Sequence, residues 1–164
     1  MKWRIVALVA LLGMAVSSLA AVNGPPPDLR VALLQPKDFQ IRTQIKAIPS
    51  AVQTAFSKGI GDKTFSMAEP GQPWQVGSAK EDPRLPRRRL QRVLLSKVFC
   101  IVFYESGGRR KNNYVAYFRL APGNAEFLGS TGNSYPPLFD LRRLLGAIDK
   151  GGVFEWIGSP DSSQ

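Results

Sequence analysis

The sequence contains no histidine and only one cysteine, Cys100. The absence of histidine removes the commonest general base, the Ser-His and Cys-His nucleophile pairs, and nearly all ordinary zinc and copper sites. A single cysteine permits no internal disulfide, so the fold has to be stabilised by burial. The chain also lacks a phosphate-binding glycine motif, a Gly-x-Ser-x-Gly elbow and a metal-ligand spacing. We therefore predict no cofactor and no metal, and we assign no catalytic residue.

Long apolar runs are scarce, and the longest one lies at the start of the chain. Residues 5–16 are apolar and uncharged, they follow the cations Lys2 and Arg4, and they lead to small residues at Ser18 and Ala20. This pattern predicts a cleavable secretory signal peptide over residues 1–21. A membrane anchor is the alternative, but a spanning helix needs roughly 20 apolar residues and this run is shorter. We expect an exported protein, periplasmic or extracellular, with no transmembrane anchor after cleavage.

The rest of the chain has the usual size of one domain. We expect a flexible proline-rich lead-in over residues 22–37, a single globular domain over 38–158 and a disordered tail over 159–164. The chain carries 22 Lys and Arg residues against 12 Asp and Glu, for a net charge of +10. It remains strongly basic after cleavage, since the signal peptide removes only Lys2 and Arg4. The oligomeric state stays open.

Hydrophobic periodicity predicts an α+β fold. A short helix near residues 49–58 would place Val52 and Phe56 on one face and end at Gly59. A C-terminal helix near 137–149 has its leucines on one side. Strands are expected at residues 38–47, 90–95, 98–104, 114–120, 125–128 and 153–157. Because residues 98–104 are apolar on both faces, they predict a central strand, within an antiparallel sheet that has a central hairpin at about 98–120 and both helices packed on it.

The first of two basic clusters contains Arg84, Arg87, Arg88, Arg89 and Arg92. Planar guanidinium groups suit phosphates and carboxylates, so this cluster predicts an anion-binding surface. An ordinary solvated segment is the alternative. If Leu90 begins a strand, Arg87 and Arg89 point to one side and Arg88 to the other, so only part of the cluster can form one patch. We expect that replacing Arg87 or Arg89 by alanine leaves the melting temperature nearly unchanged.

The second cluster follows the central strand, where Glu105, Gly107 and Gly108 lead into three cations, Arg109, Arg110 and Lys111. The glycines could let the backbone approach a ligand while the cations bind an anion. A hairpin tip is the favoured alternative, because glycines supply positive φ and charges discourage edge pairing.

Two side chains, Glu105 and Cys100, bear on catalysis. Glu105 would be the first choice for a carboxylate-dependent hydrolase, but nothing in the sequence places a second carboxylate at the distance that such chemistry requires. Cys100 lies in the most apolar strand, so we predict a buried, inert thiol.

These features favour a non-enzymatic exported domain that binds an envelope protein or an anionic envelope component, such as a polymer or a lipid head group. Nucleic acid is not expected as a partner because the protein is predicted to be exported, although its positive charge alone would be compatible with nucleic-acid binding. Two alternatives stay open, an envelope hydrolase that uses carboxylates without histidine and an inhibitor or immunity protein that acts on an exported enzyme.

Overall fold

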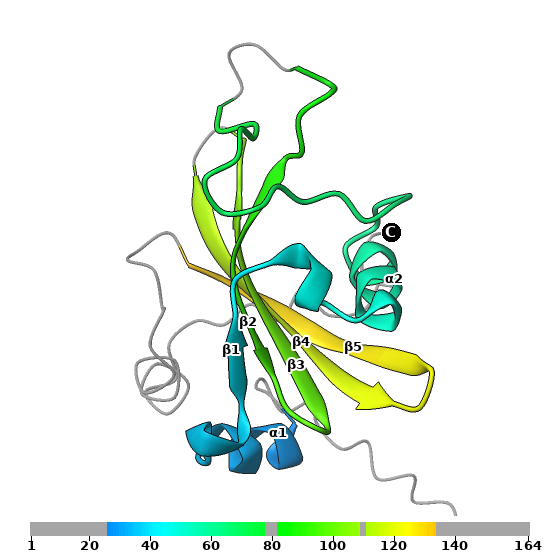
Figure 1. Ribbon diagram of the computed structural model, residues 1–164. Helices are drawn as coiled ribbons and strands as arrows, with labels where there is room; N and C mark the ends of the chain where they lie inside the picture. The colour runs from blue at the N-terminus through cyan, green and yellow to red at the C-terminus, as the bar shows by residue number, and fades with distance from the viewer. Residues whose placement is uncertain (1–25, 78–81, 109–110, 134–164) are drawn as a thin grey trace, which may run out of the picture.

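The computed structural model describes residues 26–77, 82–108 and 111–133. In chain order, the elements are helix α1 (Pro27–Leu33), the 3-10 turn η1 (Pro36–Asp38), strand β1 (Gln40–Arg42), the 3-10 turn η2 (Ile45–Ala47), helix α2 (Ser50–Gly59), and strands β2 (Arg88–Leu95), β3 (Phe99–Ser106), β4 (Asn112–Ala121) and β5 (Asn124–Asn133) (Figure 1). The fold is α+β with an antiparallel sheet. The predicted signal peptide, the helix near 137–149, the strand at 153–157 and the tail at 159–164 lie outside the described residues.

The sheet is a meander in which the strands lie in chain order, β1-β2-β3-β4-β5, and every neighbouring pair is antiparallel. Short turns connect β2 to β3 and β4 to β5, as antiparallel pairing allows. β3 is central, and its residues from Phe99 to Glu105 are buried. The predicted central strand and the predicted hairpin at about 98–120 are therefore confirmed.

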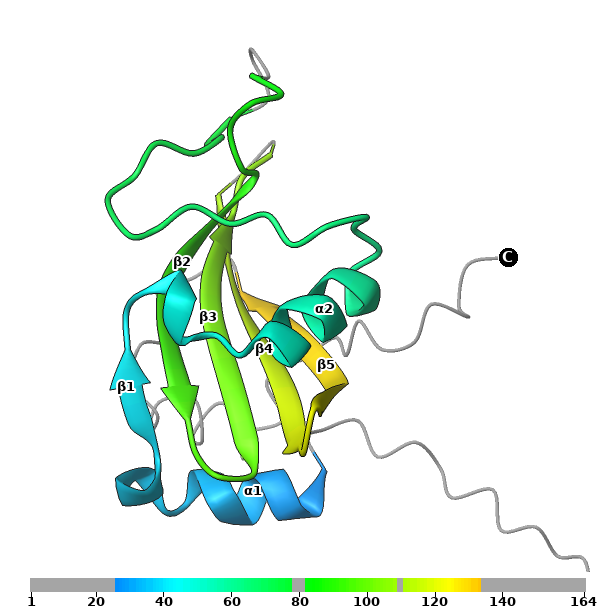
Figure 2. The same cartoon turned by 45° about the vertical axis from the view of Figure 1, so that its right-hand side comes forward.

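Helix α2 lies over one face of the sheet (Figure 2). Its buried residues Val52 and Phe56 share a cluster with side chains of β2, β3 and β4, and the Phe56 ring meets Tyr104 edge to face at 5.2 Å between centroids. At Gly59, an added Cβ would lie 2.4 Å from the ring of Phe127, so the missing side chain lets α2 approach β5 closely. The helix predicted near 49–58 is confirmed, with Val52 and Phe56 on its buried side.

Helix α1 belongs to the core of the opposite face. Leu29 and Leu33 are fully buried and pack with Phe99 and other residues of that face. Arg119 of β4 donates to Asp28 at 2.8 Å, which ties the first turn of α1 to the sheet. Within the stretch 22–37, where the sequence predicts a lead-in, residues 27–33 form this helix. Prolines at the start of a helix are tolerated, and two leucines four positions apart supply a stripe to bury.

The strand expected over 38–47 is also shorter than predicted. Only Gln40–Arg42 forms a strand, and Ile45–Ala47 is a 3-10 turn. The backbone N–H of Ile45 donates to the carboxylate of Glu69, at 3.0 Å from each oxygen, instead of to a neighbouring strand. A partner 24 positions away along the chain therefore ends the alternation that the sequence predicts.

Candidate functional site

The structure brings the two predicted basic clusters together. In the pairing of β2 with β3, Arg88 lies opposite Ser106 and Arg89 opposite Glu105, so the start of β2 and the end of β3 meet at one end of the sheet, uppermost in Figure 1. We call this region the basic end, and it comprises Arg84, Arg87, Arg88, Arg89, Glu105, Gly107, Gly108 and Lys111. Arg92 lies farther along β2, opposite Phe103. Arg109 and Arg110 are outside the described residues.

Arg88 and Arg89 point to opposite faces of the sheet, as the alternation predicts. Arg88 forms an ion pair with Asp62, and its guanidinium lies 5.9 Å from the ring centre of Phe56 on the α2 side. Arg89 donates to Glu105 on the other face. Arg88 and Arg89 therefore do not share one face of the sheet.

Glu105 is a buried carboxylate held between two cations. Its side chain is only 5% exposed. Oε2 accepts hydrogen bonds from Arg89 Nε at 2.8 Å and Nη2 at 2.6 Å, and Oε1 forms an ion pair with Lys111. Burial raises the pKa of Glu105, but hydrogen bonds from Lys111 and Arg89 outweigh it, so the pKa falls below its ordinary value. Glu105 is therefore ionised at neutral pH and is a poor proton donor.

Arg89 is also held from its other side by an aromatic ring. Its guanidinium carbon lies 5.0 Å from the ring centre of Trp74, within the range of cation–π attraction. Trp74 is itself buried, in a segment whose backbone runs along the start of β2. There the N–H of Ala68 donates to the carbonyl of Arg88 at 2.8 Å, and the N–H of Gln75 donates to the carbonyl of Pro86 at 2.9 Å.

The two glycines that follow β3, Gly107 and Gly108, allow this segment to pack closely against the end of the sheet. A Cβ on Gly107 would lie 1.7 Å from the carbonyl oxygen of Gln75, so the residue has to be glycine for the two backbones to lie this close. Gly108, at φ +149°, forms a parallel bridge with Gly77. The structure thus favours the hairpin-tip interpretation of the glycines, since the chain's own segment occupies the space that a ligand would need.

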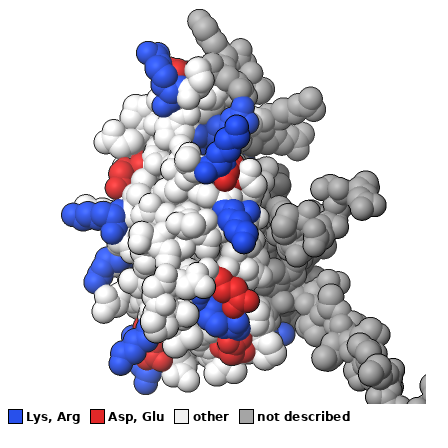
Figure 3. All heavy atoms as spheres, turned by 90° about the vertical axis from the view of Figure 1, so that its right-hand side faces the viewer, with Lys and Arg blue, Asp and Glu red and all other residues white. Residues whose placement is uncertain are grey.

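The outer part of the basic end is more exposed. Arg84 has a side chain that is 88% exposed and donates to Asp82, two positions earlier. Arg87 is exposed as well, and the Lys111 side chain is 47% exposed. Glu105 pairs with two cations, Arg89 and Lys111, so this group of three side chains carries more positive than negative charge. On the face shown in Figure 3, the Lys and Arg side chains are scattered among Asp and Glu.

Sequence reasoning missed Asp62 and gave no role at this site to Trp74. Asp62 is 26 positions from its partner Arg88, and no local pattern connects the two. The sequence did contain a signal for the role of Trp74. A single tryptophan in a polar, proline-rich segment favours burial, and the arginine cluster nearby offers a planar guanidinium to pack against.

No protein-family model, no characterised protein and no solved structure matches this chain. Across the described residues, no helix is long and apolar enough to cross a bilayer, and no group of three or more His, Cys, Asp or Glu side chains could hold a metal ion. The function has to be argued from the chemistry of the residues themselves.

Proposed function

We propose that this protein is an exported, non-enzymatic binding domain whose basic end holds a phosphate-bearing component of the cell envelope. Export is predicted from the signal peptide expected over residues 1–21. The observation that carries the proposal is the pair of cations, Arg89 and Lys111, that Glu105 holds side by side at the end of the sheet.

These two cations are positioned before any ligand arrives. Arg89 is fixed by Glu105 on one side and by the ring of Trp74 on the other, yet a quarter of its side chain is exposed. A guanidinium has five N–H donors and an ammonium has three, so Arg89 and Lys111 keep donors beyond those used on Glu105. Little side-chain freedom is lost on binding, because the ion pairs have already ordered Arg89.

Phosphate is the ligand chemistry that this pair suits best. One phosphate presents several oxygens, and charge-assisted hydrogen bonds from Arg and Lys to phosphate are among the strongest that side chains make. The pair carries one more positive charge than Glu105 neutralises, so an anion would complete the charge balance. Lipid head groups and wall polymers both supply such phosphates outside the cytoplasm.

Binding is favoured over catalysis by the state of the reactive groups that the structure describes. Glu105 is ionised and has both oxygens occupied. Cys100 is buried, and burial raises the pKa of its thiol to about 12, so it is not a thiolate at neutral pH. Neither group is poised as an acid, a base or a nucleophile.

A soluble probe without apolar parts tests the basic end directly. We expect the processed chain to bind inorganic polyphosphate more tightly than polyglutamate of equal charge. Affinity should fall at least about tenfold between about 50 mM and about 500 mM NaCl, because exposed charges are screened. Lys111→Gln should lower affinity about fivefold, whereas Lys58→Gln, an exposed cation on α2, should leave it unchanged. Equal affinity for polyglutamate, or an unaffected Lys111 variant, would contradict the proposal.

The predicted export of the protein needs its own test. Cell fractionation with N-terminal sequencing should find a chain that begins at Ala21 or Val22 in the envelope or the medium. A chain that begins at Met1 and remains in the cytoplasm would remove the envelope as the source of the ligand, whatever the polyphosphate result.

A further inference from the structure

The described residues cover the two faces of the sheet unequally. On the α2 side, helix α2 and the segment around Met67 pack on the strands. On the α1 side, the buried apolar side chains that come from outside the strands are Leu29, Leu33 and Phe39, all from the start of the domain. In the part of the chain that the structure describes, the α1 side therefore has much less apolar cover than the α2 side.

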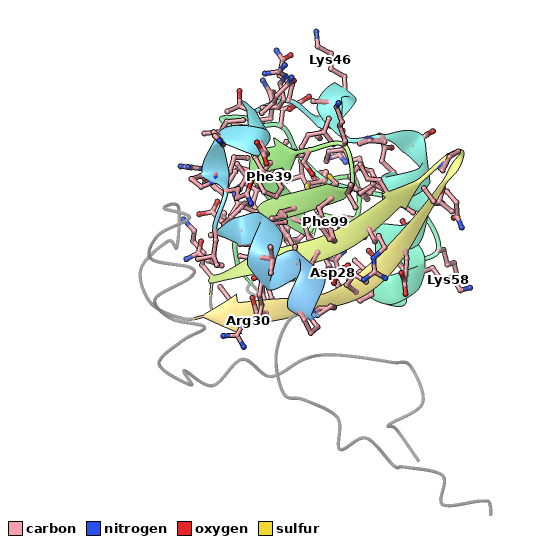
Figure 4. All side chains as sticks on the ribbon, turned by 90° about the horizontal axis from the view of Figure 1, so that it is seen from below. Asp28, Arg30, Phe39, Lys46, Lys58 and Phe99 are labelled. Carbon is pink, nitrogen blue, oxygen red and sulfur yellow. The ribbon has the colours of Figure 1, made fainter. Side chains whose placement is uncertain are left out.

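Helix α1 is also too narrow to cover this side of the sheet. It lies across one end of the strands, with Phe99 behind it in the view from below (Figure 4), and Arg119 donates to Asp28 there. A helix is about 10 Å wide, whereas the eight residues of β3 extend over about 25 Å. Trp74 packs on Arg89 at the other end of β3. The middle of the face lies between these two contacts.

A row of buried side chains crosses this middle part. Phe103 lies opposite Val115, and Val115 lies opposite Thr131. Directly opposed residues of an antiparallel pair point to the same face, and Phe103 and Val115 belong to the cluster of the α1 side. The three residues are only 3%, 4% and 4% exposed, although Thr131 lies on β5, the last strand of the described sheet. We call these three residues the middle row.

The cover of the middle row comes from the same chain, because the row is buried within a single copy. The ranges outside the described residues are 1–25, 78–81, 109–110 and 134–164. Two of them are too short to cross the sheet, and residues 1–21 are the predicted signal peptide, which is removed on export. We propose that residues 134–158 cover the middle row, with the leucines of the helix predicted near 137–149 packed on it.

This segment fits in position, length and pattern. It follows Asn133, two positions beyond Thr131, so the chain leaves the sheet beside the middle row. A helix over 137–149 would rise about 20 Å, enough to cross β2 to β5, which span about 15 Å. Its apolar residues recur at helical spacing on one side, namely Leu138, Leu141, Leu144, Leu145 and Ile148. Such a stripe needs a sheet face to cover, and the middle row supplies one. The inference does not depend on phosphate binding at the basic end.

A thiol placed in the middle row tests the proposal. Val115→Cys changes the side chain little in size, and Cys100, which packs on the α2 side, is an internal control in the same molecule. Alkylation by iodoacetamide is followed at each position by peptide mapping. In the chain that begins at Val22, we expect both thiols to be protected under native conditions. Rapid alkylation at position 115 in that chain would overturn the proposal.

Variants in the predicted helix then remove the cover. Leu141→Ser with Leu145→Ser should speed alkylation at position 115 at least about tenfold and leave Cys100 protected. Arg142→Ser with Arg143→Ser, on the opposite side of the predicted helix, is the matched control and should leave both thiols protected. Continued protection of position 115 in the Leu141 and Leu145 variant would overturn the proposal.

Hydrogen exchange of the wild-type chain gives a second measurement that needs no variant. Amides of residues 138–149 should exchange at least about tenfold more slowly than in the isolated peptide, since a helix of this length is marginal unless it is packed. Exchange at the rate of the isolated peptide would overturn the proposal. If the serine variant exposes both thiols together, the domain has unfolded and the exchange result decides.

Two other occupants of the middle row give distinct results. Protection of position 115 that requires residues 1–21 would assign the cover to the signal peptide. A dimer in sedimentation velocity, with protection that is lost on dilution to the monomer, would assign it to a second copy of this chain. Either result would overturn the proposal.

Discussion

Glu105→Gln should destabilise the fold although it changes one side chain very little in shape. The amide can still accept a hydrogen bond from Arg89, but its NH2 group would face Arg89 or Lys111, and both cations would lose their counter-charge. Removing one partner of a fully buried pair costs about 3–5 kcal/mol. Here Arg89 is 25% exposed and Lys111 47% exposed, so water can recover part of the loss.

The expected loss is therefore about 2 kcal/mol, close to the value of a hydrogen bond to a charged group. For a domain of this size, that corresponds to a fall in Tm of roughly 6–10 °C. Thermal and urea unfolding followed by circular dichroism would measure it. The matched control is Glu126→Gln. Glu126 also pairs with an arginine, Arg119, at 2.7 Å, but it is exposed, and we expect no measurable change.

The pH dependence gives a second test of the same reasoning. The pKa of Glu105 in the folded protein lies below the ordinary value of 4.5. A depressed pKa contributes stability that is fully present above the unfolded-state value and is lost as the pH falls through the folded-state value. The gap between wild type and Glu105→Gln should therefore be complete near neutral pH and shrink below about pH 4. Equal stability near neutral pH, or a gap that persists in acid, would refute the assignment.

Four further measurements probe the packing around this site and the core. Arg89→Ala should lower the Tm by several degrees and Arg84→Ala should not, because Arg89 pairs with buried Glu105 whereas Arg84 is exposed. Equal shifts in Tm for the two variants would contradict this reasoning. Gly107→Ala should cost about 2 kcal/mol or more in urea unfolding, because its Cβ would meet the Gln75 carbonyl, while Gly77→Ala, with open space around its Cβ, should cost less. Cys100 should react with a thiol reagent only after denaturant is added, and rapid labelling of the native protein would show that β3 is accessible. Phe56→Ala should destabilise by about 3–5 kcal/mol, since it empties the centre of the α2 cluster; a loss below about 1 kcal/mol would mean that the core collapses around it.

Local patterns predicted the central elements well. The apolar run at 98–104 predicted the doubly covered β3, and the spacing of Val52 and Phe56 predicted α2. Both succeed because side-chain periodicity is a property of a few neighbouring residues. The predictions failed where a distant partner decides the backbone, as at Ile45, whose N–H bonds to Glu69. The sequence also predicted that replacing Arg89 would leave the melting temperature nearly unchanged. That prediction is revised, because Arg89 pairs with buried Glu105, 16 positions away.

By itself, the sequence determined the kinds of elements, the opposite directions of Arg88 and Arg89, and the absence of histidine chemistry, because composition and alternation need no tertiary information. Only the tertiary structure decided which charges are neutralised. Asp62, Trp74 and Glu105 reach the arginines from segments far away in the chain, and a contact between distant segments leaves no periodic trace in either one. The exposed side of α1 has the same origin. Val31 and Leu34 are exposed because Leu29 and Leu33 dock on the sheet, and only the packed domain determines which side of that helix is covered.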